Sequence, residues 1–556
     1  MKETAMATNN IHRSGGGTMG AADMQVDIVP GTDVLRDAED RHLKHGRGSD
    51  TILIPQPSNN SDDPLNWAPA WKYLVIIAQF LYVFVAVESS LSMAPMFPLL
   101  GKEWGLNETQ LGLLTGGCIL GLGYANFLIV PFSNIFGRRL ASISLAALTF
   151  LTVLWEALAT SHRAFLAARV VNGLTTATTE SIMMQVVADV FFLHERGLWT
   201  GIYFTSYFFG LFLGPVIAGN IAERHGWRSF FWLSLALSAF NIITIVLFFP
   251  ETKYQRSAAT LGGKTEVVDE PAPTTNTKKH DTHESIKAPN DTETSDTDSQ
   301  YGKGRPSKKQ FMLFQKPDPR WKGFLIRDIF SPIRAFFYPI IFWAGLNVAG
   351  PANLLLFFNL TESAVLAAPP YNFSSGAVGY SNFAFFVGGT IGLLTAGPFS
   401  DWVADKATRR NRGIREAEMR LPAMIPFFIT TAIGNVIGGL GYQHQWSWPI
   451  ILVFGYGLTG LSVTTVPTIA VAYAVDCYKP MSGEIMVVAT VVKNTIGFSM
   501  SYWVPPLGAR KGLIAPAMVE FALTMGPMLF AVPVYYCGKR LRRLTRNSTF
   551  HQWSET

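Results

Sequence analysis

The strongest constraint on this chain is a series of long apolar runs separated by polar stretches. The hydrocarbon core of a bilayer is about 30 Å thick, so roughly 20 apolar residues form one membrane-spanning helix. Twelve such runs occur, at residues 73–99, 109–131, 140–160, 164–190, 198–222, 230–249, 334–359, 379–398, 422–442, 448–476, 484–505 and 513–537. They predict an all-α membrane protein with twelve transmembrane helices in two six-helix halves.

The composition supports this interpretation. Charged residues make up only 15% of the chain, whereas a soluble domain carries about 25%. Hydrophobic residues reach 49%, which argues against a soluble enzyme and against a disordered protein. The three cysteines, Cys118, Cys477 and Cys537, lie in apolar runs and cannot form a disulfide framework.

The polar segments set the expected domain boundaries. Residues 1–70 are predicted to be a disordered tail, 71–250 the first helical bundle, 251–330 a mostly disordered linker, 331–538 the second bundle, and 539–556 a basic tail. About 70 polar residues precede the first run, so we expect no cleavable signal peptide. The stretch 321–332 is either a short helix on the membrane surface or a lead-in to the seventh span.

The distribution of lysine and arginine indicates the orientation. Basic residues cluster in the loop after the second run, in the loop after the eighth run and in the C-terminal tail. Because cytoplasmic loops carry such an excess, both termini and the linker are predicted to be cytoplasmic. The net charge of +6 is then a topology signal and not a sign of nucleic-acid binding. Three glycosylation acceptors fall on the predicted outer side or at its boundary: Asn107, Asn359 and Asn372.

An internal repeat supports two related halves. Pro131-Phe132-Ser133 precedes Arg138-Arg139 after the second run, and the same tripeptide after Gly397 precedes Arg409-Arg410 after the eighth run. Parallel six-helix repeats around a central site are a transporter architecture, with the substrate near the membrane midplane.

Four local sequences extend this to a family resemblance: Asp63 to Trp67, Arg169 to Gly173, Gly210 to Gly219, and Asp189 with His194 to Gly197. Together they resemble the major facilitator superfamily, and within it the fungal 12-spanner drug:proton antiporters. The resemblance implies a transporter rather than an enzyme, driven by the proton gradient without a cofactor. It also implies that Gly210, Gly214, Pro215 and Gly219 form the antiporter motif of the fifth helix. Asn134 departs from the family pattern, which has an acidic residue there.

Ionisable residues inside membrane helices are costly, so each is a functional candidate. Glu88 lies roughly 24 Å into the first helix, which predicts a position toward the outer cavity or an outer salt bridge. Glu180 is the favoured proton or cation site, and a hydrogen bond to its threonine-rich neighbourhood is the alternative. The resemblance implies that Arg169 takes part in proton coupling. Lys493 needs a carboxylate partner or a wet cavity, and either binds substrate or forms a fixed internal salt bridge.

Charged residues at the inner helix ends are expected to act as a gate that is broken and remade during transport. This set comprises Arg138, Arg139, Asp189, Glu195, Arg196, Asp401, Arg409, Arg410, Asp476 and Glu484. Glu520, in the peripheral twelfth helix, is expected to be structural.

The sequence therefore predicts a proton-coupled antiporter that exports a small organic compound such as a drug, toxin or secondary metabolite. The alternative is proton-coupled uptake of a small organic cation such as a polyamine. The expected partners are the substrate, protons and the lipid bilayer, with no nucleic acid and no metal, in a monomer of the plasma membrane. Gly262 to Thr265 resembles the end of a P-loop, but its first glycine is replaced by Ala258, so ATP binding is not expected.

Overall fold

The computed structural model describes residues 32–34, 55, 57–58, 60, 62–254, 302, 304–314, 319–411, 414–478 and 481–545. The predictions for most of the N-terminal tail, most of the linker and the end of the C-terminal tail lie outside these residues. Residues 62–68 belong to the predicted tail but are packed against the bundle, where Leu65 and Trp67 are fully buried. The carboxylate of Asp63 accepts the Leu65 amide and begins a short 3₁₀ turn, Pro64–Asn66.

The first half contains nine helices, which form the six predicted spans. They are α1 Pro69–Leu91, α2 Phe97–Trp104, α3 Glu108–Tyr124, α4 Asn126–Phe136, α5 Arg138–Leu158, α6 His162–Thr176, α7 Thr178–Val190, α8 Leu193–His225 and α9 Trp227–Phe248. The first predicted run is interrupted, because Pro95 and Pro98 follow α1 and residues Ala94–Met96 form the 3₁₀ turn η2.

The second half follows the helix α10, Trp321–Ala335. Its helices are α11 Pro339–Leu366, α12 Ser375–Ser381, α13 Phe383–Arg410, α14 Met424–Gln443, α15 Trp448–Ile450, α16 Gly457–Cys477, α17 Ser482–Lys511, α18 Ile514–Leu529 and α19 Ala531–Thr545. The short segments η5 Lys308–Phe311, η6 Ala417–Ala423 and η7 Ile451–Tyr456 complete the helical structure. Strands β1 Thr32–Val34 and β2 Ile414–Glu416 pair antiparallel, with Asp33 opposite Arg415.

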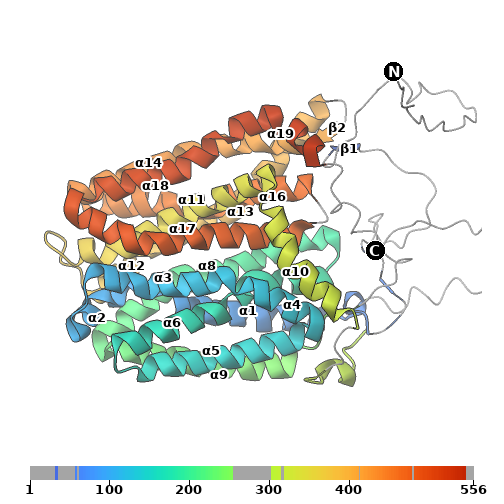
Figure 1. Cartoon of the computed structure of the whole chain (residues 1–556), viewed down its shortest axis with the longest axis horizontal. Coiled ribbons are helices and arrows are strands. Elements are labelled where there is room, and N and C mark those ends of the chain that lie inside the picture. The colour runs from blue at the N-terminus through green and yellow to red at the C-terminus, as the bar shows by residue number, and fades with distance from the viewer. Residues whose placement is uncertain are drawn as a thin grey trace, which may run out of the picture.

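Within the described residues, nine helices are long and apolar enough to cross a membrane, or up to eleven if each bent pair is one span. The bent pairs are α3 with α4, at 42°, and α18 with α19, at 44°. The remaining predicted span, the fourth in the chain at residues 164–190, is formed by α6 and α7, which break at Ala177 and are only 15 and 13 residues long. Figure 1 shows the two halves as separate bundles that lie against each other.

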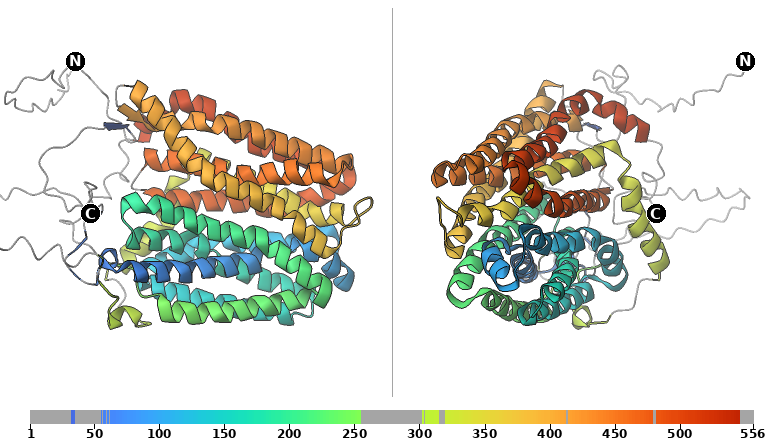
Figure 2. Two further views of the ribbon diagram at one scale, coloured as in Figure 1. Left: turned by 180° about the vertical axis from the view of Figure 1, so that it is seen from behind. Right: turned by 60° about the vertical axis from the view of Figure 1, so that its left-hand side comes forward.

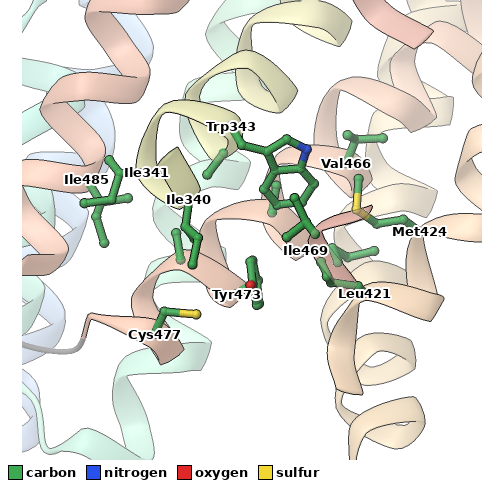
Figure 3. Close-up of a cluster of buried hydrophobic side chains, with 14 of the residues drawn as sticks. Ile340, Ile341, Trp343, Leu421, Met424, Val466, Ile469, Tyr473, Cys477 and Ile485 are labelled. Carbon is green, nitrogen blue, oxygen red and sulfur yellow. The ribbon is translucent and has the colours of Figure 1, made fainter. Parts of the chain in front are cut away.

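Each half packs around its own core. In the second half, Ile340 and Trp343 of α11, Met424 of α14 and Tyr473 of α16 pack into one buried cluster (Figure 3). Large apolar side chains also cover the outside, such as Leu128 at 69% exposure and Leu394 at 73%. An exposed apolar surface of this kind fits contact with lipid. A chain built from helices also fits lipid, because helices form their backbone hydrogen bonds internally.

The halves meet along two seams. Helix α17 lies along α3, and α8 lies along α12 and α13 (Figures 1 and 2). Small residues permit the close approach: a Cβ atom on Gly116 of α3 would lie 2.2 Å from Ser501 Oγ of α17. We call the end of the bundle with α10 and the strands the linker end, and the end with α2 the far end (Figure 1).

The halves also touch at the far end. Ser363 Oγ of α11 donates to the Ala94 carbonyl of η2, and Tyr380 Oη donates to Asn220 Oδ1 at 2.8 Å. Glu223 of α8 accepts the Gly376 amide of α12 at 2.7 Å. The far end is therefore closed by bonds between the two halves.

Helix α10 crosses the linker end and contacts both halves. Asn134 Nδ2 of α4 donates to Asp328 Oδ2 at 2.5 Å, and Ser331 Oγ donates to Glu484 Oε1 of α17 at 3.0 Å. The other face of α10 exposes apolar side chains, including Ile326 at 60% and Phe330 at 54%. An amphipathic helix of this kind fits the membrane surface, the first of the two alternatives for this stretch.

Candidate functional site

An ion pair between the two halves forms the centre of the candidate site. Lys493 Nζ of α17 lies 2.5 Å from Glu180 Oε1 of α7. Glu180 is in the first turn of α7, directly after the break at Ala177, and Lys493 lies well inside the 30-residue helix α17. The structure thus brings together two residues that were predicted separately.

Two tyrosines of α8 surround this pair. Tyr207 Oη donates to Glu180 Oε1 at 3.2 Å, and Lys493 Nζ lies 5.9 Å from the centre of the Tyr207 ring. Tyr203 Oη donates to the main-chain carbonyl of Thr179, next to Glu180. The carboxylate is therefore oriented from α8, and the cation lies near an aromatic ring, which attracts positive charge.

One oxygen of the carboxylate has no partner among the described residues. Glu180 Oε2 is buried and accepts no hydrogen bond from the described residues. The whole Glu180 side chain is only 7% exposed. A buried polar atom without a partner costs about 1–3 kcal/mol. The site therefore has an acceptor available for a further donor.

A second buried ion pair lies within the first half. Arg169 Nη1 of α6 is 3.3 Å from Glu156 Oε1 of α5, and both side chains have no exposed surface. Arg169 also donates to the main-chain carbonyls of Ser89, Ser90 and Leu114. This arginine links three neighbouring helices to α6, and its predicted part in proton coupling stays a prediction.

The partner of Arg169 was missed by the sequence reasoning. Glu156 lies near the end of an otherwise apolar run, and its charge in that run was the available signal. Asn172 Nδ2 donates to both of its oxygens at 3.1 Å.

Glu88 lies inside the first half and does not contact the Glu180–Lys493 pair. Its side chain is fully buried between α1 and α9, where Ser234 Oγ donates to it at 3.2–3.3 Å. Glu88 has no ion-pair partner among the described residues, so the expected outer salt bridge is not formed in this structure. Its predicted role in proton or substrate binding stays a prediction. Gly214 lets α8 pack closely against this side chain, since a Cβ atom there would lie 3.3 Å from Glu88 Cγ.

A second buried carboxylate, Glu362 of α11, was also missed. It is fully buried, and Asn382 Nδ2 donates to it at 3.3 Å. The signal for it is an internal repeat: Glu-Ser, four residues and Ala-Pro occur from Glu88 to Pro95 and again from Glu362 to Pro369. The two carboxylates therefore occupy matching positions in the first helix of each half.

The glycine motif of α8 lies in the contacts that α8 makes with α1 and with α12. Cβ atoms on Gly210 and Gly214 would meet α1, at 2.8 Å from Phe84 O and 2.1 Å from Ser92 Oγ. A Cβ atom on Gly219 would lie 2.4 Å from Ser375 O of α12, in the other half. Pro215 lies between these glycines inside the helix, and its carbonyl faces Gly379 of α12.

An arginine network lies at the linker end of the first half. Arg138 Nε is 3.3 Å from Asp189 Oδ2, and Arg138 Nη1 donates to Asn134 Oδ1 at 2.8 Å and to Ser133 Oγ at 3.2 Å. Glu251, which was not predicted, accepts the Arg138 amide at 2.9 Å.

The second half repeats this network with a different arginine. Arg420 of η6 lies 2.8 Å from Asp401 and 3.1 Å from Asp476, and it donates to Ser400 Oγ at 3.0 Å. Arg420 therefore corresponds to Arg138. The internal repeat in the sequence had matched Arg138 and Arg139 with Arg409 and Arg410. Helix α13 continues past the repeat, however, and leaves Arg409 and Arg410 exposed in its last turn.

The other predicted gate residues bond to nearby helix ends. Arg139 Nη2 donates to the Val246 carbonyl at the end of α9, and Arg196 Nη2 donates to the Ala188 carbonyl of α7 at 2.7 Å. Glu195 is half-buried in the first turn of α8, and Glu484 accepts Ser331 of α10 as described above. Cations near helix C-termini are favourable, so Arg139 and Arg196 brace their own half.

Three other predictions can be placed in the structure. Glu520 is fully buried, and Thr524 Oγ1 donates to it at 3.0 Å within α18. Asn107 caps α3 and Asn372 lies in a turn, and both are exposed, whereas Asn359 donates to Leu355 O inside α11. Over the described ranges there is no group of three or more metal-ligating side chains.

Several known proteins that resemble this chain are named as transporters. The family model described as "Major Facilitator Superfamily" matches residues 78–502. An uncharacterized MFS-type transporter of Schizosaccharomyces pombe is 30% identical, over 94% of each chain. Protein HOL1 of Saccharomyces cerevisiae is 28% identical, over 94% of this chain and 96% of its own. The efflux pump radE of Floropilus chiversii is 24% identical, over 86% and 82%.

Solved structures share the fold. The xylose transporter XylE of E. coli, in a partially occluded inward-open conformation, matches with a TM-score of 0.55. It is 12% identical, and the match covers 83% of this chain and 99% of that one. The two six-helix halves expected from the sequence are therefore confirmed as a known transporter fold.

Proposed function

This chain belongs to the Major Facilitator Superfamily of transporters, and from that premise we propose that it is a proton-coupled antiporter that exports a small organic compound. The compound is a drug, toxin or secondary metabolite, and transport proceeds by alternating access. We place the protein in the plasma membrane, with both termini in the cytosol. The Glu180–Lys493 ion pair between the two halves carries this proposal.

The ion pair acts as a lock on the empty transporter. Glu180 and Lys493 belong to different halves, so rocking of the halves has to separate or rearrange them. Removing one member of a buried pair costs about 3–5 kcal/mol because the other charge is left uncompensated. The empty transporter is therefore held in one state until something else neutralises Glu180.

Two ligands release this lock. A proton on Glu180 removes the charge that holds Lys493, and a cationic group of the substrate replaces Lys493 as the partner of the carboxylate. One carboxylate accepts only one of them at a time. Because each loaded form crosses and the empty form does not, a proton moving one way is exchanged for a substrate moving the other way, which is antiport.

The remaining contacts support rocking of two rigid bodies. The networks of Arg138 and Arg420 lie within their own halves, so they keep each half intact during the movement. The bonds at the far end join the halves directly, as Ser363 does with Ala94. Those are the contacts that break when the far end opens.

Export is the preferred direction on two grounds. The glycine sequence of α8 resembles the antiporter motif, and the glycines lie in the contacts that α8 makes with α1 and α12. A relative that spans most of the chain is named an efflux pump.

Everted membrane vesicles test this proposal. A panel of drugs and fungal metabolites is offered to vesicles that contain the full chain and have an acidic lumen. At least one compound should accumulate, and Glu180→Gln should abolish the accumulation. Glu108→Gln is the matched control, since Glu108 is an exposed residue at the start of α3. Accumulation that survives collapse of the proton gradient, or that persists in Glu180→Gln, contradicts antiport through this carboxylate.

Uptake of a small organic cation such as a polyamine is the second candidate. The observation that favours it is the site itself, in which a carboxylate and a tyrosine ring surround a cation. Uptake predicts accumulation in whole cells that increases at acidic external pH, whereas export predicts that expression lowers cellular content.

A further inference from the structure

We infer that the substrate carries a primary or secondary ammonium group, which binds Glu180 at the position that Lys493 Nζ occupies in the empty transporter. This inference rests on the proposed function and adds to it the chemical class of the substrate. It also assigns Lys493 a specific role, as a tethered competitor for the substrate.

Lys493 marks a binding position for a small cation. Its Nζ atom contacts Glu180 Oε1 at 2.5 Å and lies 5.9 Å from the Tyr207 ring centre. An ammonium group is compact and carries three donors on a flexible stem. A substrate amine of the same geometry makes the same two contacts.

The two members of the pair differ in how easily they move. The Lys493 side chain is 17% exposed and the Glu180 side chain 7%. Tyr207 Oη fixes the carboxylate, whereas within the described part of the chain Lys493 Nζ is held by Glu180 and the Tyr207 ring alone. The lysine is thus the partner that leaves, and the carboxylate is the partner that stays.

The second carboxylate oxygen sets the kind of amine. Glu180 Oε2 is buried and has no hydrogen-bond partner in the described part of the chain. A primary ammonium has three N–H donors and a secondary one has two, so either can bond both oxygens, whereas a quaternary ammonium has none. The unpartnered oxygen therefore favours amines with at least two N–H groups over fully methylated ones.

The same geometry argues against an anionic substrate on Lys493. Its ammonium is already paired with Glu180 at 2.5 Å, and an anion would meet that carboxylate. Like charges in a site of low dielectric constant repel strongly.

Ligand binding to the purified full-length protein tests the inference. The probes are n-butylammonium, 2-phenylethylammonium, 1,4-diaminobutane and spermidine, each with its fully N-methylated counterpart, and n-butyrate as the anion. At least one amine should bind the wild type at least tenfold more tightly than its counterpart, as measured by calorimetry. Glu180→Gln should abolish that binding.

Two substitutions of Lys493 are expected to change amine binding differently. Lys493→Gln removes the competitor and should tighten amine binding at least tenfold. Lys493→Arg keeps a cation that binds carboxylates in a bidentate manner and should leave binding unchanged or weaker. A purely structural lysine would give looser binding in Lys493→Gln, so the sign separates the two roles. Size-exclusion profiles show whether each variant is folded, and Lys493→Arg remains informative if Lys493→Gln does not fold.

Besides looser amine binding in Lys493→Gln, three results overturn the inference. They are that no amine of the panel binds either the wild type or Lys493→Gln, that the methylated counterparts bind equally well, or that butyrate binds and loses affinity in Lys493→Gln. Amine binding without proton exchange would refute the proposed antiport and leave the inference standing. Proton exchange with a substrate that lacks an N–H ammonium would refute the inference and leave the proposed antiport standing.

Discussion

The buried pair of Arg169 and Glu156 gives a prediction whose size follows from the structure. Both side chains have no exposed surface, and the charged atoms are 3.3 Å apart. With an effective dielectric constant of about 20, the attraction at this distance is about 5 kcal/mol. Glu156→Gln removes it and leaves a buried arginine charge uncompensated.

The net loss should be smaller than this attraction. Arg169 keeps its hydrogen bonds to the carbonyls of Ser89, Ser90 and Leu114 in the variant. We therefore expect Glu156→Gln to destabilise the protein by about 3 kcal/mol, the lower end for a broken buried pair. The double variant Glu156→Gln/Arg169→Gln buries no charge from this pair. Its loss in the free energy of unfolding should therefore be about 2 kcal/mol smaller than the sum of the losses in the two single variants.

Thermal unfolding of the purified protein in detergent measures these differences. The double-variant cycle is the informative comparison, because it isolates the interaction from the separate effects of each residue. Additive losses, or a double variant less stable than that sum, would refute the argument that this pair is held by its charge.

Three further predictions concern packing and the linker end. Gly388→Ala places a Cβ atom 1.9 Å from a main-chain oxygen of α16 and should lower the free energy of unfolding by about 3 kcal/mol or more. Gly397→Ala, on the same helix, places its Cβ atom in open space, so its size-exclusion profile should match that of the wild type. Asn134→Asp puts a carboxylate against Asp328 and should release α10, measured by increased proteolysis of the linker, and Asp328→Asn should restore protection. Arg420→Gln removes ion pairs to the exposed Asp401 and the half-buried Asp476, so it should destabilise the second half by about 1 kcal/mol in thermal unfolding. Because this network lies within one half, vesicle transport per folded protein should stay at the wild-type rate.

Much of the fold was predictable because membrane helices are marked by local composition. The twelve apolar runs correspond to the helices of the two halves, and the breaks follow prolines or polar stretches. The end of the first run was misjudged because apolar content alone does not show that Pro95 and Pro98 interrupt the helix. Apolar length also did not reveal the break at Ala177, where α6 and α7 carry buried polar side chains.

The candidate site was predictable only in part. Glu180 and Lys493 stood out individually because charge is rare in apolar helices, but their pairing joins residues 313 positions apart. No local pattern encodes such a contact. Arg420 was missed for a related reason: the loop after the eighth span is longer than its counterpart, so an alignment by paired arginines selected Arg409 and Arg410.

The lock formed by Glu180 and Lys493 is tested most directly by proton flux without any substrate. Purified protein in liposomes is given a pH difference, and an internal pH-sensitive dye reports proton entry. The wild type should not conduct protons, because the ion pair holds the empty transporter. Lys493→Gln should leak protons, and Glu180→Gln/Lys493→Gln should not. A Lys493→Gln variant as tight as the wild type, or a leak that persists in the double variant, would contradict the central claim.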